Sequence, residues 1–227
     1  MIRLVAYNVS GGLDPVTAGS VLRELEPTVV CLLELPSTKR LRTLLRTAEL
    51  EVVARAGRRG TGTAILARED VRVRATTLVP LSTPRDVPNR QAAHAIIGVA
   101  GLGLSVTAVQ LGLRPEVRRT NLAELLAFLD TIEQPSVIGC DLNASVRSPV
   151  VTELASRYTD AYDHAGSGLG LTYPTSDPST RQDFVFVDPA LAVTAAWVPT
   201  GELVDRASHH RPVVADIDHD PAGADQP

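Results

Sequence analysis

The sequence is poor in aromatic residues and lacks an excess of positive charge, and both shortages bear on function. Phe, Trp and Tyr make up 4% of the 227 residues, and the formal net charge is −4. Such a chain has no overall basic field to gather nucleic acid and few rings on which bases could stack. The composition therefore argues against non-specific nucleic-acid binding, although it does not exclude a nuclease.

Cysteines and long apolar runs are scarce as well. Cys31 and Cys140 each lie inside an apolar segment, which favours two buried free thiols over a disulfide and argues against a secreted, disulfide-stapled scaffold. No apolar run reaches the roughly 20 residues that a membrane-spanning helix needs. Strand-like sequence begins at MIRLVAYN, where a signal peptide would stand. We therefore expect a cytoplasmic protein with no membrane partner.

Short apolar segments bounded by Gly, Pro and polar clusters are abundant. IRLVAYNV, TVVCLLEL and PSVIGCDLNA have the nearly continuous apolar character of buried strands, and residues 50–113 show strand patterns without a helix. Helices are expected at DPVTAGSVLRELEP, STKRLRTLLRTA, PEVRRTNLAELLAFLDTIEQ and SPVVTELASRY. The pattern predicts an α/β fold, a four-layer α/β/β/α sandwich in which two mainly antiparallel sheets pack face to face with helices outside. We expect one domain over residues 1–218 and a disordered tail over 219–227.

Polar residues that could form a site follow or precede the predicted strands. Carboxylates at the ends of apolar strands are costly unless something pairs with them, and a divalent cation together with a phosphate would do so. Taken singly, each residue also has an ordinary explanation as a turn residue, a surface charge, an Asx turn or a strand cap. The residues are Asn8, Glu34, Asp141, Asn143, Asp183, His209 and His210.

In their order along the chain, these segments resemble the endonuclease/exonuclease/phosphatase superfamily, which has the deoxyribonuclease I-like fold. The resemblance runs from YNV and LLELP through GTAILAR, LGLRPEVRRTNLAELL and GCDLNA to TYPTSDPSTRQDFVFV and SHHRPVVADI. No single segment decides it, whereas the ordered combination is specific. The resemblance implies a hydrolase of the nuclease or phosphodiesterase type.

The resemblance also implies a role for each residue. Glu34 would be the principal Mg²⁺ ligand, with Asn8 supporting the metal or the phosphate. Asp141 would orient or deprotonate the attacking water, and Asn143 would hold a phosphate oxygen. His210 would contact the phosphate, while Asp183 fixes the tautomer and supports the charge of this imidazole.

Two positions depart from the family pattern. Gln110 stands where the family has a histidine, and His209 stands where it has an aspartate. Gln110 can donate a hydrogen bond to a phosphate but cannot carry a proton or a positive charge. His209 either removes a carboxylate from the site or itself binds the metal, which would shift the preference from Mg²⁺ toward Mn²⁺ or Zn²⁺. Two functions stay open: a phosphoesterase with an altered site, and a weak or inactive relative that binds a phosphate ligand.

Arginines in two predicted loops bear on the substrate. Arg58, Arg59, Arg85 and Arg90 either meet phosphates near the site or are solvated loop charges. The acidic net charge and the few aromatic residues favour a small phosphoester or a specific nucleic-acid end over bulk duplex DNA.

Overall fold

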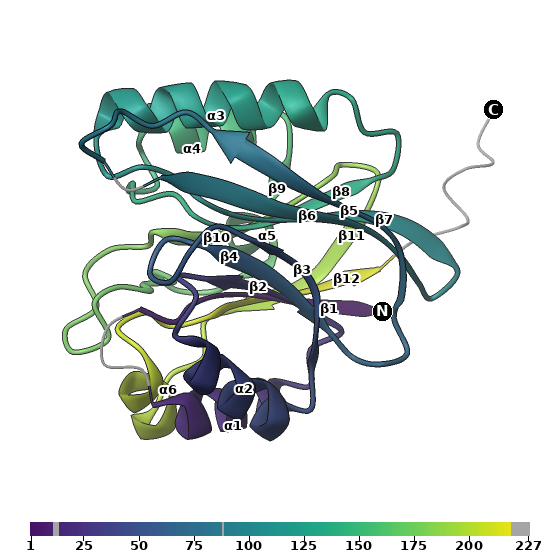
Figure 1. Ribbon diagram of the computed structural model, residues 1–227, viewed down its shortest axis with the longest axis vertical. Coiled ribbons are helices and arrows are strands. Elements are labelled where there is room, and N and C mark those ends of the chain that lie inside the picture. The colour runs from purple at the N-terminus through teal and green to yellow at the C-terminus, as the bar shows by residue number, and fades with distance from the viewer. Residues whose placement is uncertain (11–13, 88, 219–227) are drawn as a thin grey trace.

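The computed structural model describes residues 1–10, 14–87 and 89–218, and these residues form two packed sheets with helices on the outer faces (Figure 1). This arrangement confirms the four-layer sandwich expected from the sequence. The expected disordered tail, residues 219–227, lies outside the described residues. No helix among the described residues is long and apolar enough to cross a membrane.

The first sheet has the strand order β11-β12-β1-β2-β4-β3. Strands β1 and β2 are parallel, and the other ladders of this sheet are antiparallel. The last two strands return from the far end of the chain to complete the sheet that the first strands begin. The strands are β1 (Ile2–Asn8), β2 (Val29–Leu33), β3 (Glu51–Ala56), β4 (Thr63–Ala67), β11 (Ala192–Trp197) and β12 (Val213–Asp218).

The second sheet has the order β5-β6-β7-β8-β10-β9, with β7 and β8 parallel and its other ladders antiparallel. Apolar residues from the facing sides of both sheets form the central core. The sheets approach closely where Gly139 of β8 faces Cys31 of β2, since a Cβ at Gly139 would lie 2.4 Å from the Cys31 Cβ. The strands are β5 (Arg72–Leu81), β6 (Arg90–Val99), β7 (Leu102–Gln110), β8 (Ser136–Asp141), β9 (Thr159–Asp160) and β10 (Asp183–Val187).

Amphipathic helices cover the outer faces. Helices α1 (Pro15–Leu25), α2 (Thr38–Ala48) and α6 (Glu202–Ala207) pack on the first sheet, and α3 (Pro115–Leu129) and α4 (Pro149–Ala155) on the second (Figure 1). Asp14 caps α1 by accepting from the Val16 N–H at 3.1 Å, and Pro15 occupies the first helical position as the sequence predicts. The apolar stripe of α3 is buried at its expected positions, Leu122, Leu125, Leu126 and Leu129.

Two short helices, α5 (Ala161–Ala165) and α6, were not predicted from the sequence. Five or six residues are too few to show a helical period. The prediction of two buried free thiols is confirmed, because Cys31 and Cys140 are both free and buried.

Candidate active site

The predicted site residues meet where strands of both sheets end. In the parallel pair β1 and β2, Asn8 lies opposite Leu33, so Glu34 follows directly beside it. In the second sheet, Gln110 of β7 and Asp183 of β10 both lie opposite Asp141 of β8. Because the two sheets pack face to face, these two edges come together at one end of the sandwich. Register therefore explains why residues far apart in the chain converge here.

Two amide side chains join carboxylates across the sheets. Asn8 Nδ2 donates to Asp141 Oδ2 at 2.9 Å and to Glu34 Oε1 at 3.3 Å. Gln110 Nε2 donates to the same two oxygens, at 3.0 Å and 2.6 Å respectively. Burial raises the pKa of the Asp141 carboxyl, and the charge of Asp183 raises it further. These amides offset part of the cost of holding two carboxylates close together.

A buried arginine sets the orientation of one of these amides. Arg90, at the start of β6, is 6% exposed, and its Nη1 donates to Gln110 Oε1. The bond turns the Gln110 oxygen toward the guanidinium and the Gln110 nitrogen toward the carboxylates. Burial lowers the pKa of Arg90, while the charges of Glu34 and Asp141 act in the opposite direction. Arg90 was predicted as one of four loop arginines, but in the structure it is part of the site.

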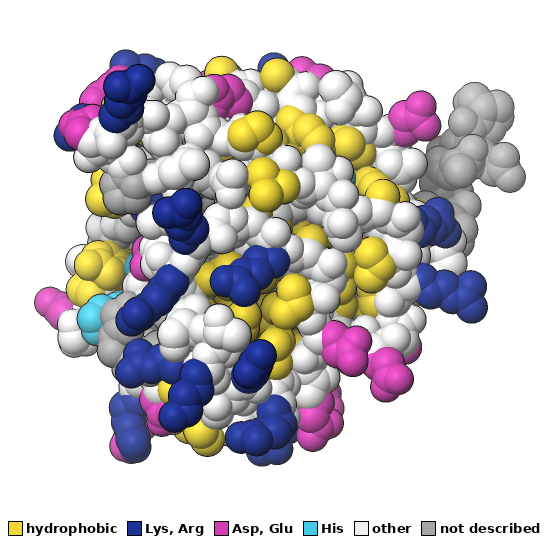
Figure 2. Space-filling model, viewed as in Figure 1, with side chains coloured by type: hydrophobic (Ala, Val, Ile, Leu, Met, Phe, Trp, Pro, Cys, Tyr) yellow, Lys and Arg dark blue, Asp and Glu magenta, His cyan; other side chains and the backbone are white. Residues whose placement is uncertain are grey.

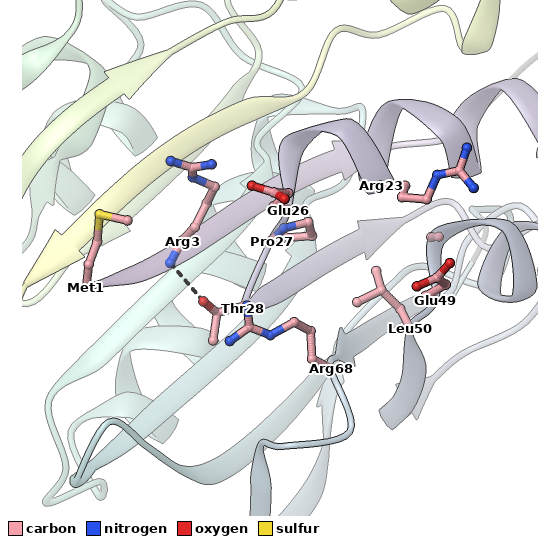
Figure 3. A pocket seen from close by; sticks show the side chains of 10 residues that line it. Met1, Arg3, Arg23, Glu26, Pro27, Thr28, Glu49, Leu50 and Arg68 are labelled. Carbon is pink, nitrogen blue, oxygen red and sulfur yellow. Dashed lines mark hydrogen bonds between the residues drawn. The ribbon is translucent and has the colours of Figure 1, made fainter.

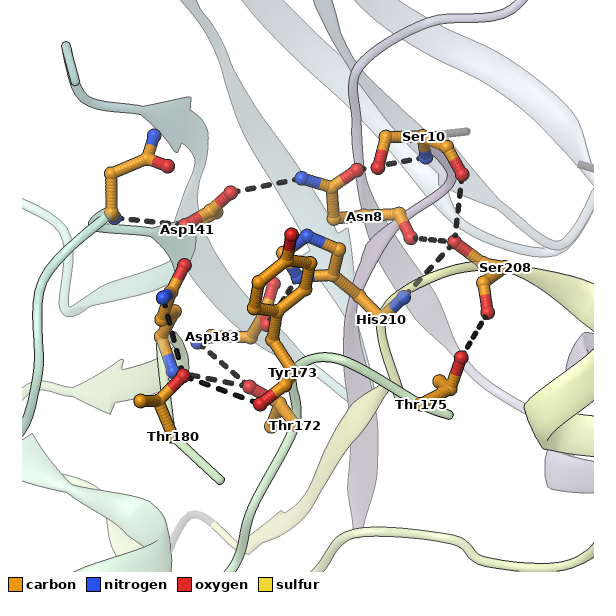
Figure 4. A network of polar contacts seen from close by, with 12 residues as sticks. Asn8, Ser10, Asp141, Thr172, Tyr173, Thr175, Thr180, Asp183, Ser208 and His210 are labelled. Carbon is orange, nitrogen blue, oxygen red and sulfur yellow. Dashed lines mark hydrogen bonds and ion pairs between the residues drawn. The ribbon is translucent and has the colours of Figure 1, made fainter. Parts of the chain in front are cut away.

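An imidazole–carboxylate pair lies beside the amide network (Figure 4). His210 Nδ1 and Asp183 Oδ2 are 2.8 Å apart, and both side chains are buried. Burial alone would lower the pKa of His210, but the charge of Asp183 and its hydrogen bond outweigh burial and raise it to about 9. With Nδ1 engaged, Nε2 is the ring nitrogen left for a ligand.

Residues not predicted from the sequence hold His210 in place. The Tyr173 ring packs against the imidazole with a centroid separation of 4.6 Å. Ser208 Oγ accepts from the His210 backbone N–H at 3.3 Å and donates to the Asn8 carbonyl at 2.7 Å (Figure 4). The Tyr173–His210 and Ser208–Asn8 contacts link segments far apart in the chain, so their pattern is not visible in the sequence. Of these residues, Ser208 alone adjoins the predicted histidines in the sequence, as the serine of SHHRP.

Two predicted residues occupy less direct positions. Asn143 has a φ of 47°, its N–H donates to Asp141 Oδ1 at 2.8 Å, and its Nδ2 donates to the Leu111 carbonyl at 2.8 Å. It therefore forms the Asx-type turn that the sequence left as an alternative, and its phosphate role stays a prediction. The His209 side chain is exposed and is not in the cluster described next. Its role as a metal ligand also stays a prediction.

The donor set fits a hard divalent cation. Among the described residues, ligand atoms of Asp141, Asp183 and His210 lie within 4.8 Å of one another, and Glu34 is linked to Asp141 through the shared amides. Asp183 Oδ1 is buried without a hydrogen-bond partner, which leaves a carboxylate oxygen for another ligand. Carboxylate oxygens are ligands that Mg²⁺ and Mn²⁺ accept.

Comparison with known proteins decides the family. The model of the Endonuclease/Exonuclease/phosphatase family matches residues 5–212. The chain belongs to this family. Endonuclease/exonuclease/phosphatase family members are typically hydrolases and commonly use divalent metals. A search of curated protein sequences finds no match.

Solved structures of this family share the fold. An endonuclease/exonuclease/phosphatase from Bacteroides vulgatus superimposes with a TM-score of 0.83 at 19% identity, covering 96% of this chain and 99% of that one. The mannosyl-6-phosphatase of Bacteroides thetaiotaomicron gives 0.84 at 13% identity, with 96% and 100% covered. The catalytic domain of human Nocturnin, solved with a bound sulfate anion, gives 0.74 at 18% identity, with 96% and 93% covered. At these identities the likeness establishes the fold alone.

Proposed function

We propose that the protein is a divalent-metal-dependent phosphoesterase that hydrolyses a phosphodiester or phosphomonoester by in-line attack of water. The observation that supports this most is the His210–Asp183 pair, which lies with Asp141 in one cluster of ligand atoms beside Glu34. Such an arrangement combines a fixed imidazole, a buried carboxylate and an oxygen-rich cation site. Each part matches a requirement of phosphoryl transfer to water.

Each side chain has a distinct task in this proposal. Glu34 would hold the metal, which supplies positive charge to the phosphate when bound, and Asn8, whose Nδ2 donates to Glu34 and Asp141, would support the metal by orienting these carboxylates. Asp141 would accept a proton from the attacking water, because burial raises the pKa of its carboxyl. Protonated His210 would donate from Nε2 to a phosphate oxygen while Asp183 holds Nδ1.

Gln110 and Arg90 together would compensate for a missing histidine. Gln110 is neutral, but its amide accepts from the buried guanidinium and donates toward the carboxylates. The permanent positive charge of Arg90 thus lies next to Gln110, the residue that stands where the family has an imidazole. Arg90 acts here as a positioning residue, because its contact with the site runs through Gln110.

Hydrolysis of a phosphodiester and phosphomonoester panel with Mg²⁺, Mn²⁺, Zn²⁺ or a chelator tests the proposal. We expect metal-dependent turnover that Glu34→Gln and His210→Gln reduce by on the order of 10²-fold or more. Arg46→Gln, an exposed change on α2, is the control. Turnover that appears only after Gln110→His with His209→Asp would instead indicate a protein that binds a phosphate ligand without hydrolysing it.

A further inference from the structure

A basic groove opens beside the site. It has a volume of about 780 Å³, and the residues that line it include Arg55, Arg58, Arg59, Thr61, Asn89 and Gln91. Arg55 belongs to β3 and Leu78, another lining residue, to β5, so the groove lies where the edge strands of the two sheets meet. None of its lining residues is acidic or aromatic. The groove is therefore suited to an anion rather than to a stacked ring.

Hydrogen bonds place one wall of the groove next to a site residue, and chain connectivity places the other. The β3–β4 loop is bonded to Leu35, the neighbour of Glu34: the Gly60 N–H donates to the Leu35 carbonyl at 2.9 Å, and the Leu35 N–H to the Gly62 carbonyl at 3.0 Å. On the other wall, Asn89 and Gln91 flank Arg90 in the chain. A ligand in the groove would thus extend from the two segments that carry Glu34 and Arg90.

The arginines of the groove have no acidic partners. Within the described part of the chain, no salt bridge and no side-chain hydrogen bond involves the guanidinium of Arg55, Arg58 or Arg59. Lys and Arg side chains gather in a band across the left and lower centre of the face in Figure 2, although the chain carries a net charge of −4. Unpaired like charges in one concave place repel one another, and an anion relieves this repulsion.

A second cavity shows the opposite pattern (Figure 3). It has a volume of about 480 Å³ at the beginning of β1, and Glu26 and Glu49 line it together with arginines. Two of its arginines are paired with acidic residues outside the lining: Arg3 with Asp216 at 2.7 Å and Arg68 with Asp70 at 3.1 Å. Unlike this cavity, the groove beside the site has no acidic lining residue to offset its positive charge.

We propose that this groove binds a second phosphate of the substrate, separate from the phosphate that is hydrolysed. Assigning the phosphate to a substrate rests on the proposed function, whereas phosphate binding by the groove does not. Guanidinium forks match the geometry of phosphate oxygens in a bidentate way, and Thr61, Asn89 and Gln91 supply neutral donors around them. The substrate class is then a molecule with two phosphates, either a small bisphosphate or the end of a nucleic-acid strand.

Binding measured by calorimetry in chelator tests this without requiring turnover. The probes are fructose 1,6-bisphosphate, thymidine 3′,5′-bisphosphate and tetrathymidylate, with the full chain as receptor. The double variant Arg58→Gln with Arg59→Gln should weaken at least one probe by roughly tenfold or more, since hydrogen bonds to charged groups are lost. The substitutions spare the loop, because its bonds to Arg58 use the backbone carbonyl. The amide NMR signals of Thr61 and Gln91 should shift on binding.

Arg23→Gln is the matched control, since Arg23 is an exposed arginine that lines the cavity of Figure 3. It should change affinity less than about twofold. A preference for tetrathymidylate would identify a nucleic-acid strand, and a preference for a bisphosphate would identify a small molecule. Failure of every probe to bind, an equal loss in the control, or unshifted signals would each overturn the inference. If the double variant and the control Arg23→Gln bound the probes alike while the protein still hydrolysed phosphoesters, the groove inference would fail and the proposed function would stand.

Discussion

The His210–Asp183 pair predicts how stability depends on pH. His210 has its pKa raised from 6.5 to about 9 in the folded protein, so between these values the native state holds a proton that the unfolded chain has released. The stabilisation is complete below pH 6.5 and is lost as the pH rises through about 9. At 1.36 kcal/mol for each pH unit, the free energy of unfolding should fall by about 3 kcal/mol over this range.

The assay compares the wild-type protein with His210→Gln by urea unfolding at several pH values from about 6 to 9.5, in chelator. Glutamine can still donate to Asp183 but does not titrate. The buried thiols of Cys31 and Cys140, whose pKa values burial raises, also destabilise the folded state at high pH. They contribute equally to both proteins and cancel in the difference. Parallel stability curves would refute the assignment of the proton to His210.

Three further predictions concern a buried ion pair between Arg181 and Asp160, the contact between the sheets and the departure from the family pattern at position 110. Arg181→Met leaves the buried Asp160 carboxylate, now 2.9 Å from the guanidinium, without its partner and should cost about 3–5 kcal/mol in urea unfolding; a loss below about 1 kcal/mol would contradict this. Gly139→Ala forces a Cβ against Cys31 and should cost about 1–3 kcal/mol, and an unchanged unfolding midpoint would show that the sheets separate easily. Gln110→His should add an ionisation near neutral pH to the kcat/KM profile, and superimposable profiles would place residue 110 outside the reaction.

The sequence allowed the strands and most of the site to be predicted because both depend on local pattern. Nearly continuous apolar runs marked β1, β2 and β8, and the polar residue after each run marked the edge where Asn8, Glu34 and Asp141 meet. Family resemblance supplied the order of these segments. Parallel register then brought Asn8 beside Glu34 in one sheet and Gln110 beside Asp141 in the other.

The features that could not be predicted depend on long-range packing. Arg90 looked like one of four loop arginines, and its burial against Gln110 follows only from the pairing of β6 with β7. Tyr173 reaches His210 through a long irregular segment that has no periodic signal. The return of β11 and β12 to the first sheet is likewise a matter of topology, which apolar pattern does not encode.

The pairing of β1 with β12 has a consequence for how the protein is made. Ser208 bonds to Asn8, 200 residues earlier, and Arg3 pairs with Asp216, 213 residues later. On the ribosome, β1 can pair early with β2, but its second neighbour, β12, emerges only after nearly the whole chain has been made. Contacts of such long range are slow to form. The pocket around His210 is consequently assembled at the end of synthesis, and a nascent or truncated chain that stops before His210 holds Glu34 and Asp141 but not the complete candidate active site.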